Sequence, residues 1–144
     1  MVPECYVLLV DDEVDFIEVL AERLEARGLK VDTAVDGQAA LVKAADRTFD
    51  AILLDMAMPG LDGIQTLRGL LDINSDLQVI LLTGQATLRQ AVEAMKLGAL
   101  DLMEKPVEIE TLVARIEDAA LRRSKLDDKR IEQRMSDILR KKGW

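Results

Sequence analysis

The stretch YVLLVDDE, residues 6–13, sets five apolar residues directly before three acids. Comparable apolar runs lead into polar side chains at AILLD, residues 51–55, at VILLTG, residues 79–84, and at DLMEKP, residues 101–106. Short apolar runs bounded by polar residues are typical of buried strands. Together with one more run, VDTAV, they predict five strands, at residues 6–10, 31–35, 51–54, 79–82 and 101–103.

The segments between these strands carry apolar residues at helical spacing, as at Ile17, Leu20 and Leu24. Gly28 and Gly98 stand where two such helices should end, since the left-handed residue that closes a helix is most often glycine. Strands that alternate with helices need right-handed crossovers, which predicts a doubly wound α/β domain with a five-stranded parallel sheet. The flavodoxin-like strand order 2-1-3-4-5 is expected, and such sheets bind ligands beyond the carboxyl ends of their strands.

The composition narrows the chemistry that this chain can perform. Its 144 residues, 49% hydrophobic and 32% charged, are typical of one globular domain. There is no histidine and one cysteine, Cys5, which excludes histidine-based catalysis, a thiolate metal cluster and an internal disulfide. No signal peptide or membrane span is expected, and the lone cysteine suits a reducing cytoplasm. A formal charge of −8 argues against direct binding of nucleic acid.

The acids that follow the first and third strands should lie together. These strands are neighbours in the expected order, so Asp11, Asp12 and Asp55 converge at one edge of the sheet. Three close carboxylates repel one another, and Mg²⁺, which prefers oxygen ligands, would relieve that repulsion. A carboxylate beside Mg²⁺ can act as a nucleophile and form an aspartyl phosphate. Lys105 offers a positive charge to the phosphoryl oxygens, and Thr83 offers a hydroxyl donor.

Each of these motifs also has an ordinary structural interpretation. An acidic run after a strand is more often a turn or a helix cap, which could be the whole role of Asp12 or Glu13. A Lys-Pro pair is usually part of a loop, and a threonine that ends a strand is usually there for its β propensity. The functional interpretation is favoured because the acids, the threonine and the lysine occur together in one chain, each at the end of a predicted strand and in this order along the sequence.

At these residues the chain resembles the receiver domains of response regulators, over nearly all of residues 5–123. The resemblance rests on VDDE at 10–13, DMAMPGLDG at 55–63, LTG at 82–84, GALD at 98–101 and KP at 105–106. It implies a signalling switch of a two-component phosphorelay that is phosphorylated on Asp55. It also implies that Asp12, Asp55 and the backbone carbonyl of Met56 hold Mg²⁺, with Asp11 acting largely through water.

The resemblance implies a cis peptide bond before Pro106 and an external phosphodonor, either a histidine kinase or a phosphotransfer protein. Three positions depart from the family's pattern. Leu102 stands where receiver domains commonly have Tyr or Phe, and Ala57 and Gln85 stand where polar side chains often position the hydrolytic water. We therefore expect the signal to pass mainly through Thr83, without a paired motion of an aromatic ring.

The end of the chain has a different charge balance. Residues 124–144 contain 7 basic and 4 acidic residues, whereas residues 1–123 contain 12 basic and 23 acidic ones. This contrast predicts a receiver domain over 1–123 and a basic helical extension over 124–144. The extension could be a separate helix capped at Ser124, or the continuation of a fifth helix that should begin near Glu108. A solvated helix is the ordinary interpretation, and a homodimer or partner-docking helix is the alternative.

Two rival functions fit the same residues. The chain could be the N-terminal receiver fragment of a larger transcriptional activator, since no DNA-binding module fits in its tail. It could instead be an aspartyl-phosphate phosphohydrolase related to the haloacid dehalogenases, although DDEVD at residues 11–15 does not match their Asp-x-Asp-x-Thr/Val motif. The sequence does not identify the output partner in either case.

Overall fold

The computed structural model of the chain describes residues 4–56, 62–84 and 88–141. Five strands form one parallel sheet in the order β2-β1-β3-β4-β5, which confirms the predicted doubly wound topology. The strands are β1 (Tyr6–Val10), β2 (Lys30–Ala34), β3 (Ala51–Asp55), β4 (Val79–Thr83) and β5 (Asp101–Glu104). No predicted strand end differs from the observed one by more than one residue.

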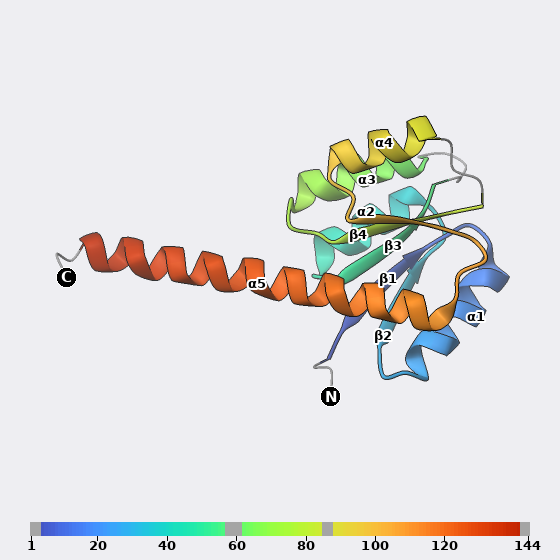
Figure 1. Ribbon diagram of the computed structural model, residues 1–144, viewed down its shortest axis with the longest axis horizontal. Helices are drawn as coiled ribbons and strands as arrows, with labels where there is room; N and C mark the ends of the chain where they lie inside the picture. The colour runs from blue at the N-terminus through green and yellow to red at the C-terminus, as the bar shows by residue number, and fades with distance from the viewer. Residues whose placement is uncertain (1–3, 57–61, 85–87, 142–144) are drawn as a thin grey trace.

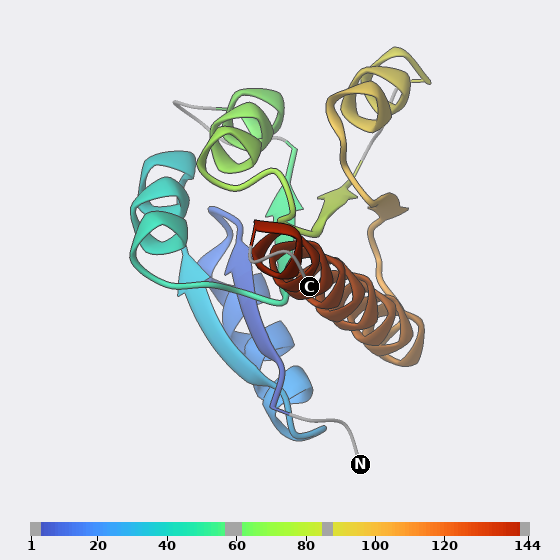
Figure 2. The same cartoon turned by 90° about the vertical axis from the view of Figure 1, so that its left-hand side faces the viewer.

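Helices cover both faces of this sheet (Figures 1 and 2). They are α1 (Val14–Glu25), α2 (Gly37–Asp46), α3 (Gly63–Ile73), α4 (Leu88–Leu97) and α5 (Ile109–Lys141). Buried side chains of α1 and α5 pack on one face, and those of α2, α3 and α4 pack on the other. The sheet therefore separates two hydrophobic cores.

The central strands supply side chains to both cores in alternation. In β1, Leu8 and Val10 join the core under α2, α3 and α4, whereas Val7 and Leu9 join the core under α1 and α5. All four side chains are buried, and burying one of this size contributes about 1.5–3 kcal/mol to stability. Because both faces of β1, β3 and β4 are covered, these strands appear in the sequence as unbroken apolar runs.

Local signals in the sequence explain where several helices begin and end. Gly28 and Gly98 follow α1 and α4 with φ of 89° and 112°, the left-handed conformation predicted for them. Helix α3 begins with a capping box, in which the Asp62 carboxylate accepts from the Gln65 N–H and the Gln65 side chain accepts from the Asp62 N–H. These two bonds satisfy backbone donors that would otherwise lack partners at the start of the helix.

Helix α5 runs without interruption from Ile109 to Lys141, over 33 residues, a length of about 50 Å. Of the two interpretations of the tail, continuation of the fifth helix is therefore the correct one, and Ser124 lies within the helix. The first half packs on the sheet through Leu112, Ile116 and Ala119, and the second half protrudes from the domain (Figure 1). Among the described residues no helix, α5 included, combines the length and apolar character needed to cross a membrane.

Candidate functional site

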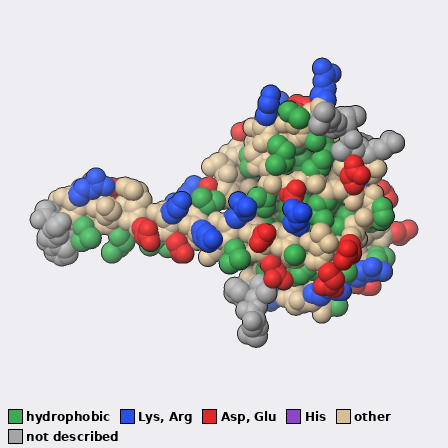
Figure 3. Space-filling model, viewed as in Figure 1, with side chains coloured by type: hydrophobic (Ala, Val, Ile, Leu, Met, Phe, Trp, Pro, Cys, Tyr) green, Lys and Arg blue, Asp and Glu red, His purple; other side chains and the backbone are tan. Residues whose placement is uncertain are grey.

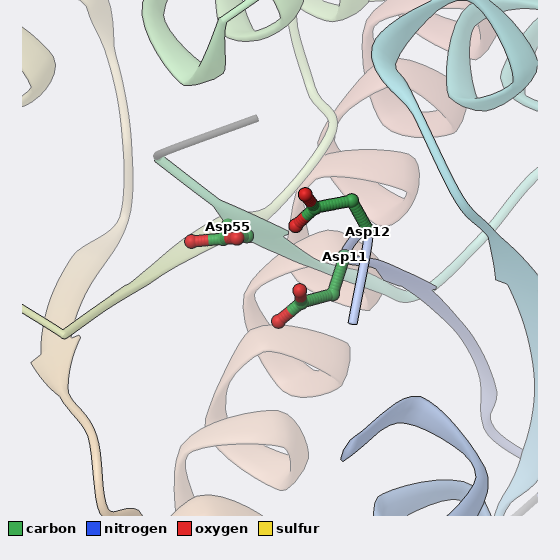
Figure 4. Close-up of side chains that lie close together, drawn as sticks. All are labelled: Asp11, Asp12 and Asp55. Carbon is green, nitrogen blue, oxygen red and sulfur yellow. The ribbon is translucent and has the colours of Figure 1, made fainter. Parts of the chain in front are cut away.

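The three carboxylates meet where β1 and β3 end. Val10 is paired with Leu54 in the parallel register, so the residues that come after them emerge at the same edge of the sheet. Ligand oxygens of Asp11, Asp12 and Asp55 all lie within 4.8 Å of one another (Figure 4). Asp11 and Asp55 are buried, with 3% and 4% of their surface exposed, and Asp12 is exposed to solvent. The convergence predicted from the sequence is therefore present.

Lys105, just after β5, brings a positive charge into this acidic group. Its Nζ lies 2.7 Å from Asp11 Oδ2, 3.6 Å from Glu13 Oε1 and 4.0 Å from Asp55 Oδ1. The ammonium also stands 4.3 Å from the centre of the Phe16 ring, where a cation–π contact adds to its attraction. Burial works to lower the pKa of Lys105, but the hydrogen bond and charge of Asp11, with Asp55 and Glu13, raise it above its ordinary value. The lysine therefore stays charged.

The charge balance of the site suits a divalent cation. One lysine does not neutralise three clustered carboxylates, of which two are buried. The two oxygens of Asp11 already accept from Lys105 Nζ and from the Glu13 N–H, at 2.7 and 2.9 Å, while the exposed Asp12 is open to solvent. Hard oxygen donors within this reach are what divalent cations such as Mg²⁺ or Ca²⁺ prefer. The acidic triad could thus bind a divalent ion.

The backbone of Met56 is held next to the site by Gly63, a residue to which sequence reasoning assigned no role. Met56 donates its N–H to Leu82 O at 3.1 Å, and its carbonyl accepts from the Gly63 N–H at 3.0 Å. A Cβ at Gly63 would stand 2.4 Å from Met56 Cα, closer than such atoms approach. Only glycine fits between α3 and the end of β3. The one sequence signal was a glycine directly after the helix-capping Asp62.

Thr83 on β4 and Leu102 on β5 differ in how they stand to Asp55, the phosphoacceptor candidate. Thr83 ends β4, is 2% exposed and accepts through its carbonyl from the Lys105 N–H at 2.7 Å. Its neighbour Leu82 is paired with Asp55, so the structure places Thr83 beside the triad. Leu102 is partly buried and packs against the core under α2, α3 and α4. Ala57 and Gln85, the other two departures from the receiver pattern, lie outside the described residues.

The peptide bond between Lys105 and Pro106 is cis, as the resemblance implied.

The position of the Glu13 side chain is not explained by helix capping. Glu13 is the residue before α1, but its side chain makes no capping hydrogen bond and lies instead near Lys105. The capping interpretation of the Glu13 side chain is therefore wrong.

Comparison of the sequence with known proteins agrees with the fold and the site described above. Residues 7–117 match the family described as the response regulator receiver domain. The transcriptional regulatory protein ZraR of Escherichia coli O157:H7 is 36% identical over 113 residues, covering 78% of this chain and 26% of ZraR. The chain thus spans about a quarter of the length of this relative.

Solved structures agree with that match. A response regulator receiver domain protein from Clostridium thermocellum is similar with a TM-score of 0.81 and 33% identity, over 85% of this chain and 98% of that one. A response regulator from Burkholderia pseudomallei, solved with a phosphorylated aspartic acid, a calcium ion and citrate, is similar with a TM-score of 0.75 and 26% identity, over 97% of this chain and 86% of that one. Fold, site and sequence agree, and the chain belongs to the response regulator receiver domain family.

Proposed function

We propose that the chain is the phosphoacceptor switch of a two-component phosphorelay, phosphorylated on Asp55 with Mg²⁺ and signalling by protein contact. The observation that carries this proposal is the convergence of Asp11, Asp12 and Asp55, with Lys105 Nζ among them. The similar Burkholderia protein, solved with a phosphorylated aspartic acid and a calcium ion, supports it. An aspartyl phosphate and a divalent ion therefore occur together in a protein of this fold.

In the proposed step a carboxylate oxygen of Asp55 attacks the phosphorus atom of the donor and forms a new oxygen–phosphorus bond. The bond from phosphorus to the donor's leaving group breaks, and the leaving group departs with the bonding electron pair. The product is an acyl phosphate on Asp55. Attack of water on its phosphorus later regenerates the carboxylate and releases inorganic phosphate. The chain assists only these two reactions of its own side chain and turns over no other substrate.

The remaining site residues position and neutralise the phosphoryl group. Asp11, Asp12, Asp55 and the Met56 carbonyl would hold Mg²⁺, which when bound offsets negative charge on carboxylate and phosphoryl oxygens. Lys105, whose side chain is 16% exposed, reaches the phosphoryl oxygens by exchanging its bond to Asp11 for one to them. Thr83 donates its hydroxyl hydrogen to a phosphoryl oxygen.

The composition of the chain indicates its partners. It has no histidine, so the phosphodonor is an external histidine kinase or phosphotransfer protein. We further propose that residues 1–123 are the receiver domain and residues 124–144 a basic extension, and that this chain works in the cytoplasm. The output passes to a protein partner and not directly to nucleic acid.

A second candidate is the receiver part of a longer transcriptional activator. The observation that favours it is the similarity to ZraR, a transcriptional regulatory protein of which this chain covers 26%. The two candidates share the phosphoacceptor chemistry and differ in whether further domains are encoded after residue 144. Sequencing the gene beyond that codon separates them, since only the second predicts an open reading frame that continues into further domains.

The proposal is tested by incubating the chain with acetyl phosphate and measuring its intact mass. We expect one added phosphoryl group in the presence of Mg²⁺ and none after chelation. Peptide mapping after borohydride reduction, which traps acyl phosphates, should assign the group to Asp55. Unchanged mass at saturating donor and Mg²⁺ would refute the phosphoacceptor function.

Mg²⁺ is expected to stabilise the fold, because it binds the native carboxylate cluster and relieves repulsion there. At a concentration 100 times its dissociation constant the gain in the free energy of unfolding should be about 2.7 kcal/mol. Asp12→Asn should shrink this gain and, with one repelling charge fewer, unfold at a higher temperature than the parent without metal. Thermal melts with and without Mg²⁺ measure both effects. Asp72→Asn, at an exposed acid of α3, is the control, and a parent melt indifferent to Mg²⁺ would contradict the site.

Thr83→Ala is expected to accept the phosphoryl group but lose most of the conformational response. Phosphorylation shifts conformers only by interacting with them differently, and the Thr83 hydroxyl is the group that can reach the new oxygens. Since Leu102 has no polar atom to respond with, changes in hydrogen exchange on adding beryllofluoride should concentrate at α4 rather than β5. Thr33→Ala, on the distant strand β2, should respond like the parent. A full response in Thr83→Ala would show that the signal takes another route.

A further inference from the structure

The protruding half of α5 exposes apolar side chains along one edge (Figure 3). Continuity of the helix decides which residues share that edge. At helical spacing, one stripe runs through Leu121, Ser124, Asp128, Ile131, Met135 and Ile138. Leu121 and Ile131 are each 60% exposed, and Met135 and Ile138 are 54% and 48% exposed. From Leu121 onward the stripe residues follow one another at regular intervals of three and four. A stripe that started at Leu126, as in a separate last helix, would not keep these intervals, because the next apolar residue, Ile131, is five positions away.

The stripe is held in a fixed direction relative to the domain. Arg123 Nη1 lies 2.8 Å from Oδ1 of Asp50, the residue before β3, and Arg130 Nη2 lies 2.6 Å from Asp76 Oδ2 in the α3–β4 connection. The two arginines are seven residues apart and lie about 100° around α5 from Ser124 and Ile131 of the stripe. Ordering the helix in advance lowers the entropy that a partner's binding would cost.

A cavity of about 440 Å³ opens beside the same face of the helix, between α5 and the start of β1. Leu121 and Ser124 line it together with Cys5. Its charged lining consists of four acids and one base: Glu4, Asp50, Glu117, Asp127 and Arg123. The last turn of α5, by contrast, is basic, with Arg140 and Lys141. One end of the stripe is thus an acidic hollow and the other end is a basic helix terminus.

We propose that a second copy of this chain packs antiparallel along the stripe, so that Met135 and Ile138 of each copy cover Ser124 and Leu121 of the other. The apolar end of one helix then lies over the cavity of its partner. The basic last turn comes beside the acidic lining. The pair is symmetric, as an isologous dimer requires.

Flanking charges select this register among the alternatives. In a helix pair the residues that flank the apolar stripe meet across the interface. In the proposed register Arg134 of one copy meets Asp127 of the other. On the opposite flank Glu132 meets Lys125. Both pairs occur twice by symmetry, so the dimer contains four complementary contacts.

Other arrangements bring like charges together. Sliding one helix by seven residues in one direction sets Arg134 against Arg134 and Glu132 against Glu132. Sliding it the other way sets Asp127 against Asp127 and Lys125 against Lys125. A parallel pair sets Asp127 against Glu132. Like charges at such positions destabilise an association, whereas opposite charges fix its register.

The residues needed for these pairs are available. Within the described part of the chain, Lys125, Glu132 and Arg134 take part in no salt bridge, and Asp127 is 3.7 Å from Arg123 Nη2 on its own helix. Asp128 is the one charged residue inside the stripe, and Arg134 of the partner copy lies within one turn of it in this register. The dimer does not depend on phosphorylation of Asp55, so its failure leaves the proposed function untouched.

The test starts with the mass of the full chain in solution, measured by light scattering over a concentration series. We expect a dimer that dissociates on dilution. Ile138→Glu should raise the dissociation constant roughly a hundredfold, by placing a charge against the apolar Leu121 of the other copy. Val42→Glu, at an exposed apolar residue of α2, should leave it unchanged. A monomer at millimolar concentration would overturn the proposal.

Paired cysteines report the direction of packing. Leu121→Cys with Ile138→Cys in one chain should form a covalent dimer on mild oxidation, because residues 121 and 138 of different copies face each other. They are 17 positions apart along one helix, about 25 Å, too far to join within a chain. Each single variant should stay uncrosslinked, and crosslinking of either single variant would show parallel packing and refute the arrangement. Cys5 does not compete, since burial, with Asp50 and Glu117, raises the pKa of its thiol to about 11.

Charge reversal tests the register itself. Arg134→Glu should weaken the dimer roughly tenfold, by placing it against Asp127. Adding Asp127→Arg in the same chain should restore the parent dissociation constant. In a parallel pair or in either shifted register Arg134 does not meet Asp127, so Arg134→Glu alone should not weaken the dimer there. Absence of weakening, or weakening that Asp127→Arg fails to rescue, would rule out the proposed register.

Discussion

Asp55→Asn is expected to abolish phosphorylation by acetyl phosphate and Mg²⁺. The amide has no anionic oxygen to attack phosphorus, and it also removes one of the three carboxylates that would hold the metal. Asp11 is not free to replace it, because it is bonded through both oxygens to Lys105 and to the Glu13 N–H. Intact-mass spectrometry should show only the unmodified chain at donor concentrations that fully modify the parent.

The variant should remain folded, which separates loss of chemistry from loss of structure. Replacing a charge in a cluster of three acids by a neutral amide relieves repulsion, so the melting temperature without metal should not fall. Asp15→Asn, at an exposed acid in the first turn of α1, is the matched control and should be phosphorylated like the parent. Full modification of Asp55→Asn would show that another residue is the acceptor.

Gly63→Ala is expected to cause the largest loss of stability among the substitutions considered for this chain. The new Cβ would stand 2.4 Å from Met56 Cα and 3.0 Å from the carbonyl oxygens of Asp55 and Met56. These are backbone atoms, which cannot turn aside as a side chain can. Relief requires the end of β3 to separate from α3, at a cost of about 3 kcal/mol or more. Chemical denaturation monitored by circular dichroism measures it.

Gly63→Ala should also weaken the binding of Mg²⁺ at the proposed metal site. Moving Met56 displaces the carbonyl that Gly63 now holds through its N–H, so stabilisation by Mg²⁺ should weaken as well. Gly69→Ala in the same helix is the matched control. Its Cβ would meet only the end of the Leu41 side chain, and the change favours a helical backbone by up to about 1 kcal/mol. Equal stability of the two variants would show that the contact at Met56 is not a constraint.

The arrangement at the site shows why some of it could be predicted. Parallel strands end at one edge of a sheet, so the order of strands decides which strand-end residues meet. The sequence alone therefore predicts that Asp11, Asp12 and Asp55 lie together. It could not say that Lys105 bonds to Asp11 at 2.7 Å and stays 4.0 Å from Asp55. Both carboxylates attract the ammonium, and only the packing of β5 and Phe16 decides between them.

By itself, then, the sequence determined the strands, the doubly wound topology and the residues at the site edge. These rest on local signals: unbroken apolar runs mark strands buried on both faces, and glycines mark helix ends. Tertiary structure alone decided the contact that requires glycine at position 63 and the continuation of α5 through Ser124. The first depends on the close approach of the backbones of Gly63 and Met56, which only the packing of α3 against the end of β3 produces. The second depends on side chains outside the helix, Asp50 and Asp76, that hold its arginines and that no local pattern in the tail could reveal.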